Sequence, residues 1–442
     1  MNQIDLFLTT PDKKNLLAKQ PAISWETITP SSGLPTLTVD ASKPQQPFLG
    51  VGGALTDSAA WLLAKAMDAT ERRAALTALF DSKRGHGFSV VRICIGASDF
   101  SVGGSYTCCD APDPTLEKFT LEREKAYLLP LLREIKKIQP KLILIASPWS
   151  APAWMKTNKS LNGGWLEWAH YETFARYLVK FVEGCAAEGV RIDYLTPQNE
   201  PRHESNSYPS MRMEPKDQAR FIGENLGPEL RKAGLKTKIL CWDHNWDAPE
   251  FPLGVLADEK ARKFTAGSAF HGYAGTPDAQ EKVRAAYPDA ELHFTESSGG
   301  DWYKDFGGNV RWDITNLLTG SVRHGARSVL KWNLVLDEAH GPQNGGCTDC
   351  RGILTWNRKA RALTKNEEFW AFGHVGRFVP PGSKVIFSSE LAEFPSVAFL
   401  RPDRRRVLVC CAEKEMAFGL RDGNRAARVT IPAGAAATLV WK

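Results

Sequence analysis

Two glutamates stand where apolar runs of the sequence end, and their setting suits acid–base and nucleophilic chemistry. Glu200 closes the run "YLTPQNE" (194–200), and Glu296 lies in "ELHFTES" (291–297). Glycoside cleavage needs two carboxyl groups, one protonated to donate to the leaving oxygen and one ionised to attack the anomeric carbon. Opposite environments set these opposite protonation states. Asn199, beside Glu200, is suited to donate a hydrogen bond to the sugar 2-hydroxyl.

Polar and aromatic residues at the ends of other apolar runs are candidates for substrate binding. They are Asp99, Trp149, His271, Tyr273, Trp332 and Asn333. An indole ring has a flat apolar face and an N–H donor, which suits a pyranose ring. Trp149 and Trp332 stand directly at the ends of their runs, so these two are expected in the site. Loop packing explains several of the other tryptophans equally well.

The elements that must position these residues are eight short apolar runs separated by amphipathic segments. Near-continuous apolar runs are typical of strands buried on both faces in a parallel sheet. Eight strand–helix units predict a (β/α)8 TIM barrel, in which the active site lies at the C-terminal ends of the strands. Glu200 and Glu296 would then end strands four and seven and approach each other at the mouth of the barrel. The runs are 48–54, 88–96, 141–147, 194–200, 238–244, 267–273, 291–297 and 328–336.

The flanks of the chain differ from its middle because they carry strand patterns without helical ones. Residues 1–45 and 378–442 read as antiparallel strands separated by turn residues. We therefore expect a catalytic barrel over residues 46–377 and a small β-sandwich side domain formed by both termini. The helix expected over 216–235 contains Pro228, which should break or kink it.

Composition excludes several classes of partner. The net charge is +6 over 442 residues, and the lysines and arginines are scattered. We therefore expect no nucleic-acid partner and no stable membrane insertion, since no run approaches the roughly 18 apolar residues of a membrane span. The N-terminus does not resemble a signal peptide. The compartment stays open between the cytoplasm and export with a removed leader, and the oligomeric state is unknown.

The role of the cysteines and the possibility of a metal site are two further questions that the sequence leaves open. Nine cysteines without regular spacing argue against a disulfide framework, and Cys347 and Cys350 form a lone CxxC. This pair could be a disulfide, half of a metal site or a reduced pair that shapes a loop. A metal-dependent barrel hydrolase is a remote alternative, because Asp243, His244, Asp247 and His271 offer ligand atoms. Their spacing matches no compact ligand motif. A carbohydrate-binding barrel without catalysis would lack one carboxylate, whereas both are present.

Seven motifs in order resemble glycoside hydrolase family 30, which includes lysosomal glucosylceramidase and β-1,6-glucanases. They are "GVGGALTDSAA", "ASDFS", "SPWSAPAWMKTN", "TPQNEP", "FHGY", "FTESSGG" and "KWNLVLDE". The resemblance implies a retaining double displacement, with Glu200 as acid/base and Glu296 as nucleophile. It also implies that Asp99 and Trp149 hold sugar hydroxyls and that His271, Tyr273 and Trp332 line the pocket. No metal or organic cofactor is expected.

The expected substrate is a carbohydrate or a glycolipid that carries a β-glucoside, either glucosylceramide or a β-1,6-linked glucoside. The long segments after strands four and eight would more naturally close a pocket around one glucosyl unit than leave a trough. Cys347 and Cys350, in the second of these segments, are expected to shape the rim of the pocket without direct chemistry. An endo-acting β-1,6-glucanase or galactanase is the alternative, and exo and endo action both stay open.

Overall fold

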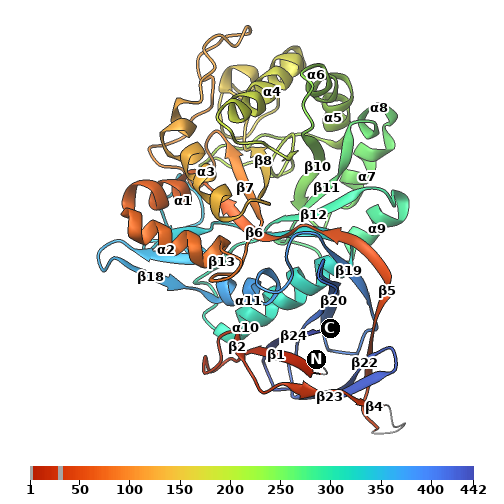
Figure 1. Cartoon of the computed structure of the whole chain (residues 1–442). Helices are drawn as coiled ribbons and strands as arrows, with labels where there is room; N and C mark the ends of the chain where they lie inside the picture. The colour runs from red at the N-terminus through yellow and green to blue at the C-terminus, as the bar shows by residue number, and fades with distance from the viewer. Residues whose placement is uncertain (1–2, 28–32) are drawn as a thin grey trace.

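The computed structural model describes residues 3–27 and 33–442, and a closed barrel of parallel strands forms its centre (Figure 1). All eight predicted runs supply barrel strands, so the (β/α)8 prediction is confirmed. The barrel closes by parallel pairing of β14 with β6, where Ser328 lies opposite Gly50. The strands are β6 (Gly50–Leu55), β7 (Val90–Ile95), β8 (Ile143–Pro148), β9 (Tyr194–Leu195), β10 (Lys238–Asn245), β11 (Thr265–His271), β12 (Glu291–Glu296) and β14 (Ala326–Lys331).

Helices surround the barrel and pack their apolar faces against it (Figure 1). Pro228 does not break its helix, because a π-helical segment (221–226) joins α5 to α6 and places Pro228 in the first turn of α6. A proline is tolerated there, since the first-turn N–H groups need no partner within the new helix. The helices are α1 (Asp57–Trp61), α2 (Ala69–Phe80), α3 (Leu129–Ile138), α4 (Tyr171–Ala187), α5 (Pro215–Arg220), α6 (Gly227–Lys232), α7 (Glu250–Ala257), α8 (Glu259–Arg262), α9 (Ala279–Ala286), α10 (Phe306–Trp312) and α11 (Glu367–Gly376).

The inside of the barrel is filled by side chains that change from apolar to polar. One buried apolar cluster comprises Val90, Ile145, Tyr194, Leu240, Ala269 and Leu330. Two residues further along β7 the buried side chain is Arg92, and on β10 the buried Asp243 follows. Layered filling of this kind is usual in such barrels. It leaves the polar layer directly beneath the C-terminal ends of the strands.

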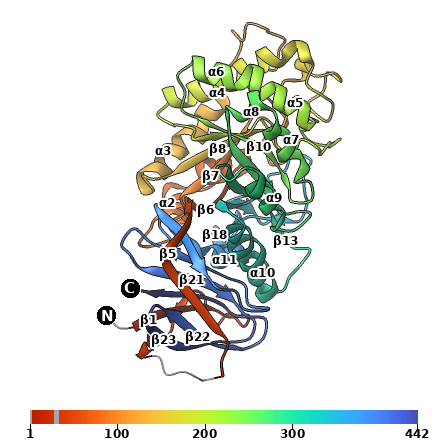
Figure 2. The same cartoon turned by 90° about the vertical axis from the view of Figure 1, so that its right-hand side faces the viewer.

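Both ends of the chain build the side domain, which lies below the barrel with N and C close together (Figure 2). Its strands join in one curled sheet in the order β2-β1-β24-β21-β20-β19-β5-β22-β23-β4, and β3 also pairs with β1. The sheet encloses an apolar cluster of its own. The strands are β1 (Gln3–Thr9), β2 (Ala18–Lys19), β3 (Ile23–Ser24), β4 (Glu26–Thr27), β5 (Thr36–Phe48), β19 (Ser383–Ser388), β20 (Ser396–Leu400), β21 (Arg406–Cys411), β22 (Met416–Asp422), β23 (Arg425–Ile431) and β24 (Ala436–Trp441).

Short strands after β12 and β14 complete the framework. β13 (Gly299–Gly300) pairs with β16 (Cys350–Arg351), and β15 (Val335–Asp337), β17 (Leu354–Asn357) and β18 (Ala362–Lys365) form a small sheet. The pairing of β13 with β16 ties the segment after strand seven to the segment after strand eight. Within the described ranges, no helix has the length and apolar character that crossing a bilayer would require.

Candidate active site

A cavity of about 380 Å³ opens at the C-terminal ends of the barrel strands and contains both glutamates. One carboxylate oxygen of Glu200 and one of Glu296 lie within 4.8 Å of each other. The structure thus brings together two residues that are far apart in the sequence. The predicted residues Asp99, Trp149, Asn199, Tyr273 and Trp332 also line this cavity. His203, Tyr208, His244, Asn245, Ser298, Trp302, Cys347 and Cys350 complete its wall.

Two predicted residues lie behind the cavity wall. His271 is fully buried, and its Nδ1 lies 3.0 Å from Glu200 Oε1. The carboxamide of Asn333 is also buried, and its Oδ1 accepts a hydrogen bond of 2.6 Å from Thr56. Neither side chain lines the cavity, so other residues separate both of them from a substrate bound there.

The backbone holds Glu200 in an unusual conformation. Its φ is +44°, in the left-handed region, and its N–H donates to the carbonyl of Asp243 at 3.0 Å. A non-glycine residue in this region costs about 1–3 kcal/mol, which the surrounding contacts must offset. Because strand β9 ends at Leu195, the chain is free to turn before Glu200 and direct its carboxylate into the cavity.

Glu296 occupies a more enclosed position at the end of β12. Its carboxylate accepts hydrogen bonds from the Arg92 guanidinium and, at 3.1 Å, from the Tyr273 hydroxyl. Only 7 % of its side chain is exposed, compared with 15 % for Glu200. Glu296 is therefore the more firmly held of the two carboxylates.

Arg92 organises the polar layer beneath both glutamates, and the sequence reading missed it. Besides Glu296, it donates to Asn199 Oδ1 and to Asp243 Oδ2, each at 2.7 Å. A full positive charge that is completely buried needs such partners. The detectable signal was an arginine in the middle of the otherwise apolar run "FSVVRICIG".

Asp243 is the second organising residue, and a bulge in β10 directs it inward. Trp242 and Asp243 both have positive φ, and the register with β11 shifts between Trp242 and His244. The Asp243 carboxylate accepts hydrogen bonds from Ser147, Thr196 and Thr295 at 2.7–2.8 Å in addition to Arg92. Its Oδ1 also lies 3.1 Å from His271 Nε2. His271 is thus held between Asp243 and Glu200.

The charges around His271 decide where protons reside. Burial alone would lower the pKa of His271, but Glu296, Asp243 and Glu200 raise it to about 9. Burial would raise the pKa of Glu200, yet the hydrogen bond and charge of His271 hold it at about 2. Burial raises the pKa of Glu296, although His271 and Arg92 oppose this. These directions are the reverse of the protonated Glu200 and ionised Glu296 expected from the sequence.

One part of the cavity wall is aromatic. Trp149 and Trp332 are stacked, with ring centroids 5.1 Å apart, and the Arg92 guanidinium lies 4.8 Å from the Trp149 ring. Asp99 stands beside them; burial, reinforced by the charges of Glu296 and Glu200, raises its pKa well above the usual range. Trp242 and Trp246 do not line this cavity, whereas Trp302 lines it together with Trp149 and Trp332.

The segment after β14 closes this aromatic side of the cavity. Asn344 donates its backbone N–H to the Asp99 carbonyl at 2.7 Å, and Ser207 donates to the Gly345 carbonyl at 2.8 Å. A Cβ at Gly346 would lie 2.6 Å from the Cβ of Asp99, so the close approach requires glycine. Cys347 and Cys350 are joined in a disulfide at the rim. The sequence left a disulfide, half of a metal site and a reduced pair as alternatives for these cysteines, and the structure contains the disulfide.

The four residues considered as metal ligands do not form one cluster. Asp247 is exposed and does not line the cavity, and Asp243 is occupied by Arg92 and three hydroxyl groups. Within the described residues, the one grouping with ligand-like spacing is Glu200, His271 and Glu296. Arg92 already neutralises Glu296 there, which disfavours a second cation at the same carboxylate.

Comparison with known proteins identifies relatives over most of the chain. The model of the glycosyl hydrolase family 30 TIM-barrel domain matches residues 48–379. An endo-1,6-β-D-glucanase of Aspergillus fumigatus is 31% identical over 406 residues, covering 84% of this chain and 80% of that protein. The lysosomal acid glucosylceramidase of Mus musculus is also 31% identical, covering 84% of this chain and 76% of that protein.

A solved structure extends the similarity to the whole fold. The endo-β1,6-glucanase BT3312 superposes with a TM-score of 0.91 at 32% identity. The superposition covers 100% of this chain and 99% of that chain, so it includes the side domain as well as the barrel.

Proposed function

This chain belongs to glycosyl hydrolase family 30 and is a glycoside hydrolase, and from that premise we propose that it cleaves β-1,6-linked glucosides with retention of configuration. The observation that carries the mechanism is the approach of Glu200 and Glu296 to within 4.8 Å. Retaining enzymes place their carboxyl groups about 5–5.5 Å apart, whereas inverting enzymes leave about 6.5–9.5 Å for a water molecule. The separation here is on the retaining side of this division and supports the proposal.

In the proposed reaction, a Glu296 oxygen attacks the anomeric carbon while Glu200 donates a proton to the departing oxygen. The bond from sugar to leaving group breaks as the ester bond to Glu296 forms. Water then attacks the same carbon, loses a proton to Glu200 and frees Glu296. Two inversions give net retention. The firmly held position of Glu296 suits the nucleophile, and the greater exposure of Glu200 suits a group that must meet both leaving group and water.

Arg92 holds Glu296 and Asn199 in position without touching the substrate. It supports the ionised form of Glu296, and by donating to Asn199 Oδ1 it directs the amide N–H groups of Asn199 away from itself. Those N–H groups can then donate to the sugar 2-hydroxyl, a contact that strengthens in the transition state. Arg92 is therefore a positioning residue in this mechanism.

The proton that Glu200 donates is held jointly with His271. Their 3.0 Å hydrogen bond joins a histidine whose pKa is raised to a carboxylate whose pKa is lowered, which favours the proton on His271. Movement of that proton from Nδ1 to Oε1 produces a neutral acid without any exchange with solvent. A glycosidic oxygen beside Glu200 favours the neutral form, because it accepts a hydrogen bond from an O–H and repels a carboxylate. Substrate binding is thus the event that transfers the proton in this proposal.

A single glucosyl unit fits the closed end of the cavity. Asp99, Trp149 and Trp332 offer hydrogen-bonding and stacking groups, and the segment carrying Asn344 blocks extension beyond them. A cavity at the lower end of the range for ligand sites, about 300–1,000 Å³, suits one sugar ring with part of its leaving group.

The proposed substrate is tested by product analysis on β-1,6-glucan, β-1,6-galactan, glucosylceramide and aryl β-glucosides. We expect β-glucose as the first-formed anomer, seen by NMR before mutarotation, with β-1,6-glucan the preferred natural substrate. Glucosylceramide is the second candidate, because of the similarity to the mouse enzyme. Faster release of ceramide than of β-1,6-linked sugar would replace the proposed substrate by the lipid. An α-anomer as first product would overturn the mechanism.

A further inference from the structure

A second and larger cavity, of about 670 Å³, adjoins the catalytic cavity and plays no part in the mechanism above. The two cavities share Tyr273, Ser298 and Trp302 in their walls. We call the second one the lateral cavity. The side chains of Trp312, Asp313 and Lys331 line it but not the catalytic cavity.

Alternation along the barrel strands explains how the same strand ends serve both cavities. Glu296 lines the catalytic cavity, and the next residue, Ser297, lines the lateral cavity. At the end of β14, Lys331 lines the lateral cavity and the next residue, Trp332, lines the catalytic one. Successive side chains of an extended chain point to opposite sides. The ends of β12 and β14 therefore supply side chains to both the catalytic cavity and the lateral cavity.

The walls of the lateral cavity combine uncovered aromatic rings. Trp302 is 55% exposed, Tyr303 48% and Trp312 40%. Large rings left in contact with water around a concavity mark a binding surface. Flat ring faces with N–H or O–H groups at their edges are the chemistry that sugar rings contact.

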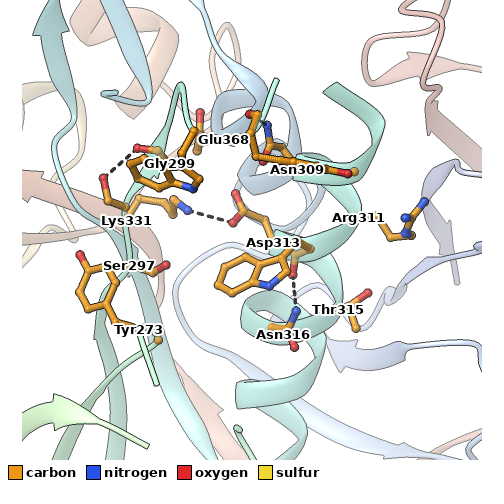
Figure 3. A pocket seen from close by; sticks show the side chains of 16 residues that line it. Tyr273, Ser297, Gly299, Asn309, Arg311, Asp313, Thr315, Asn316, Lys331 and Glu368 are labelled. Atoms are coloured by element: carbon orange, nitrogen blue, oxygen red, sulfur yellow. Dashed lines mark hydrogen bonds and ion pairs between the residues drawn. The ribbon is translucent and has the colours of Figure 1, made fainter. Parts of the chain in front are cut away.

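A buried ion pair supplies the polar groups of this cavity. Figure 3 shows Lys331 of β14 and Asp313, which begins the π-helical segment Asp313–Ser321, pointing toward each other. Lys331 Nζ lies 2.9 Å from Asp313 Oδ1, and the side chains are only 2% and 5% exposed. Within the described residues, this is the one hydrogen bond that Nζ makes, although an ammonium group has three donors. Donors and acceptors thus remain for hydroxyl groups of a ligand.

We infer that the lateral cavity is a second sugar-binding site, which holds the leaving-group side of a β-1,6-linked glucan while the catalytic cavity holds the unit to be released. This assignment rests on the proposed function. A chain whose terminal unit lies against Asp99 cannot continue past the closing segment after β14, which Asn344 and Gly345 tie down. The wall shared by the two cavities, at Tyr273 and Trp302, gives such a chain a route into the lateral cavity.

The test compares kcat/KM on β-1,6-linked gluco-oligosaccharides of increasing length with kcat/KM on an aryl β-glucoside. For the unmodified enzyme, we expect kcat/KM to rise with chain length. Trp312→Ala should lower kcat/KM for the longer oligosaccharides by about tenfold, the size of one lost aromatic contact. It should leave the aryl β-glucoside unaffected, because that substrate fills only the catalytic cavity.

Two further variants keep the test decisive. Tyr303→Ala alters an exposed side chain of the same cavity and should act in the same direction, even if Trp312→Ala unfolds the protein. Trp168→Ala removes an exposed ring outside both cavities and should change nothing. Loss on the aryl glucoside equal to the loss on oligosaccharides, or no loss on either, overturns the inference alone. An unmodified enzyme that cleaves the aryl glucoside but no β-1,6-linked oligosaccharide overturns the proposed function itself.

Discussion

At the scale of single residues, the two carboxylates should fail in different ways when removed. Glu296→Ala should abolish turnover of every glycoside, because no covalent intermediate can form. Glu200→Ala should reduce cleavage of natural glucosides by about 10²- to 10⁴-fold, and that of aryl glucosides with acidic leaving groups much less. Steady-state kinetics on both substrate types measures the difference. Equal losses from Glu200→Ala would mean that the acid has been assigned wrongly.

Added azide separates the two roles by stereochemistry. In Glu296→Ala, azide takes the empty place of the carboxylate and should give an α-glucosyl azide by one inversion. In Glu200→Ala, azide attacks the intermediate in place of water and should give the β-azide. NMR of the products identifies each, and a β-azide from Glu296→Ala would contradict its role as nucleophile.

His271 should set the alkaline limit of activity. Because its pKa is raised to about 9, the pair with Glu200 keeps its shared proton below that pH and loses it above. The kcat/KM profile should therefore fall as pH rises through about 9. In His271→Gln, Glu200 must hold the proton alone, so the alkaline limb should move to lower pH. His324→Gln, which alters a partly exposed histidine paired with Glu281, is the control. An unmoved limb in His271→Gln would refute the shared proton.

At the scale of elements, the disulfide segment should act on substrate affinity. Cys347→Ser/Cys350→Ser should loosen the closed side of the cavity and raise KM by up to about tenfold, or about 1.4 kcal/mol, with a smaller change in kcat. The other seven cysteines are buried and unpaired, so a mild reductant should reproduce the effect in the unmodified enzyme. The double variant should be insensitive to the reductant. Loss of kcat at unchanged KM would instead assign the disulfide a chemical role.

The elements also show which parts of the site a sequence can reveal. Glu200, Glu296 and the eight strands were predictable, because strand type follows from apolar runs and active-site position follows from strand ends. Arg92 was missed, since its partners come from β10, β12 and the turn after β9, which are far away in the sequence. Asp243 was considered only as a ligand in the remote metal-dependent alternative, because its inward direction depends on a bulge that leaves no pattern in the sequence. Pairing between the terminal strands likewise depends on register, which local sequence does not encode.

At the scale of the whole molecule, His374 links the barrel to the side domain. It lies on α11, and its two ring nitrogens contact Thr438 of β24 at 2.8 Å and Thr9 of β1 at 2.9 Å. Burial lowers its pKa from 6.5 to about 3. Between pH 3 and pH 6.5, this histidine is therefore protonated in the unfolded chain but neutral in the folded protein. Stability from this group is complete above pH 6.5 and is lost as pH falls toward 3.

His374→Gln should make the free energy of unfolding less dependent on pH over this range, while lowering it somewhat at neutral pH. Urea denaturation at a series of pH values measures both effects. His86, whose pKa burial also lowers to about 3, keeps its own contribution in the variant. His170→Gln, on the barrel away from this contact, is the control and should leave the slope unchanged. Identical slopes for His374→Gln and the unmodified protein would refute the role of this buried histidine.

The antiparallel pairing of β1 with β24, in which Leu6 lies opposite Leu439, has a consequence for biosynthesis. Residues emerge from the ribosome in order, so β1 can pair early with β2 and β3 but appears long before β24, its neighbour on the other edge. The barrel can assemble during translation, while β1 waits with an unpaired edge that invites association with other nascent chains. A chaperone that shields the N-terminal segment until translation ends would therefore raise the yield of native enzyme more than one that acts on the released polypeptide.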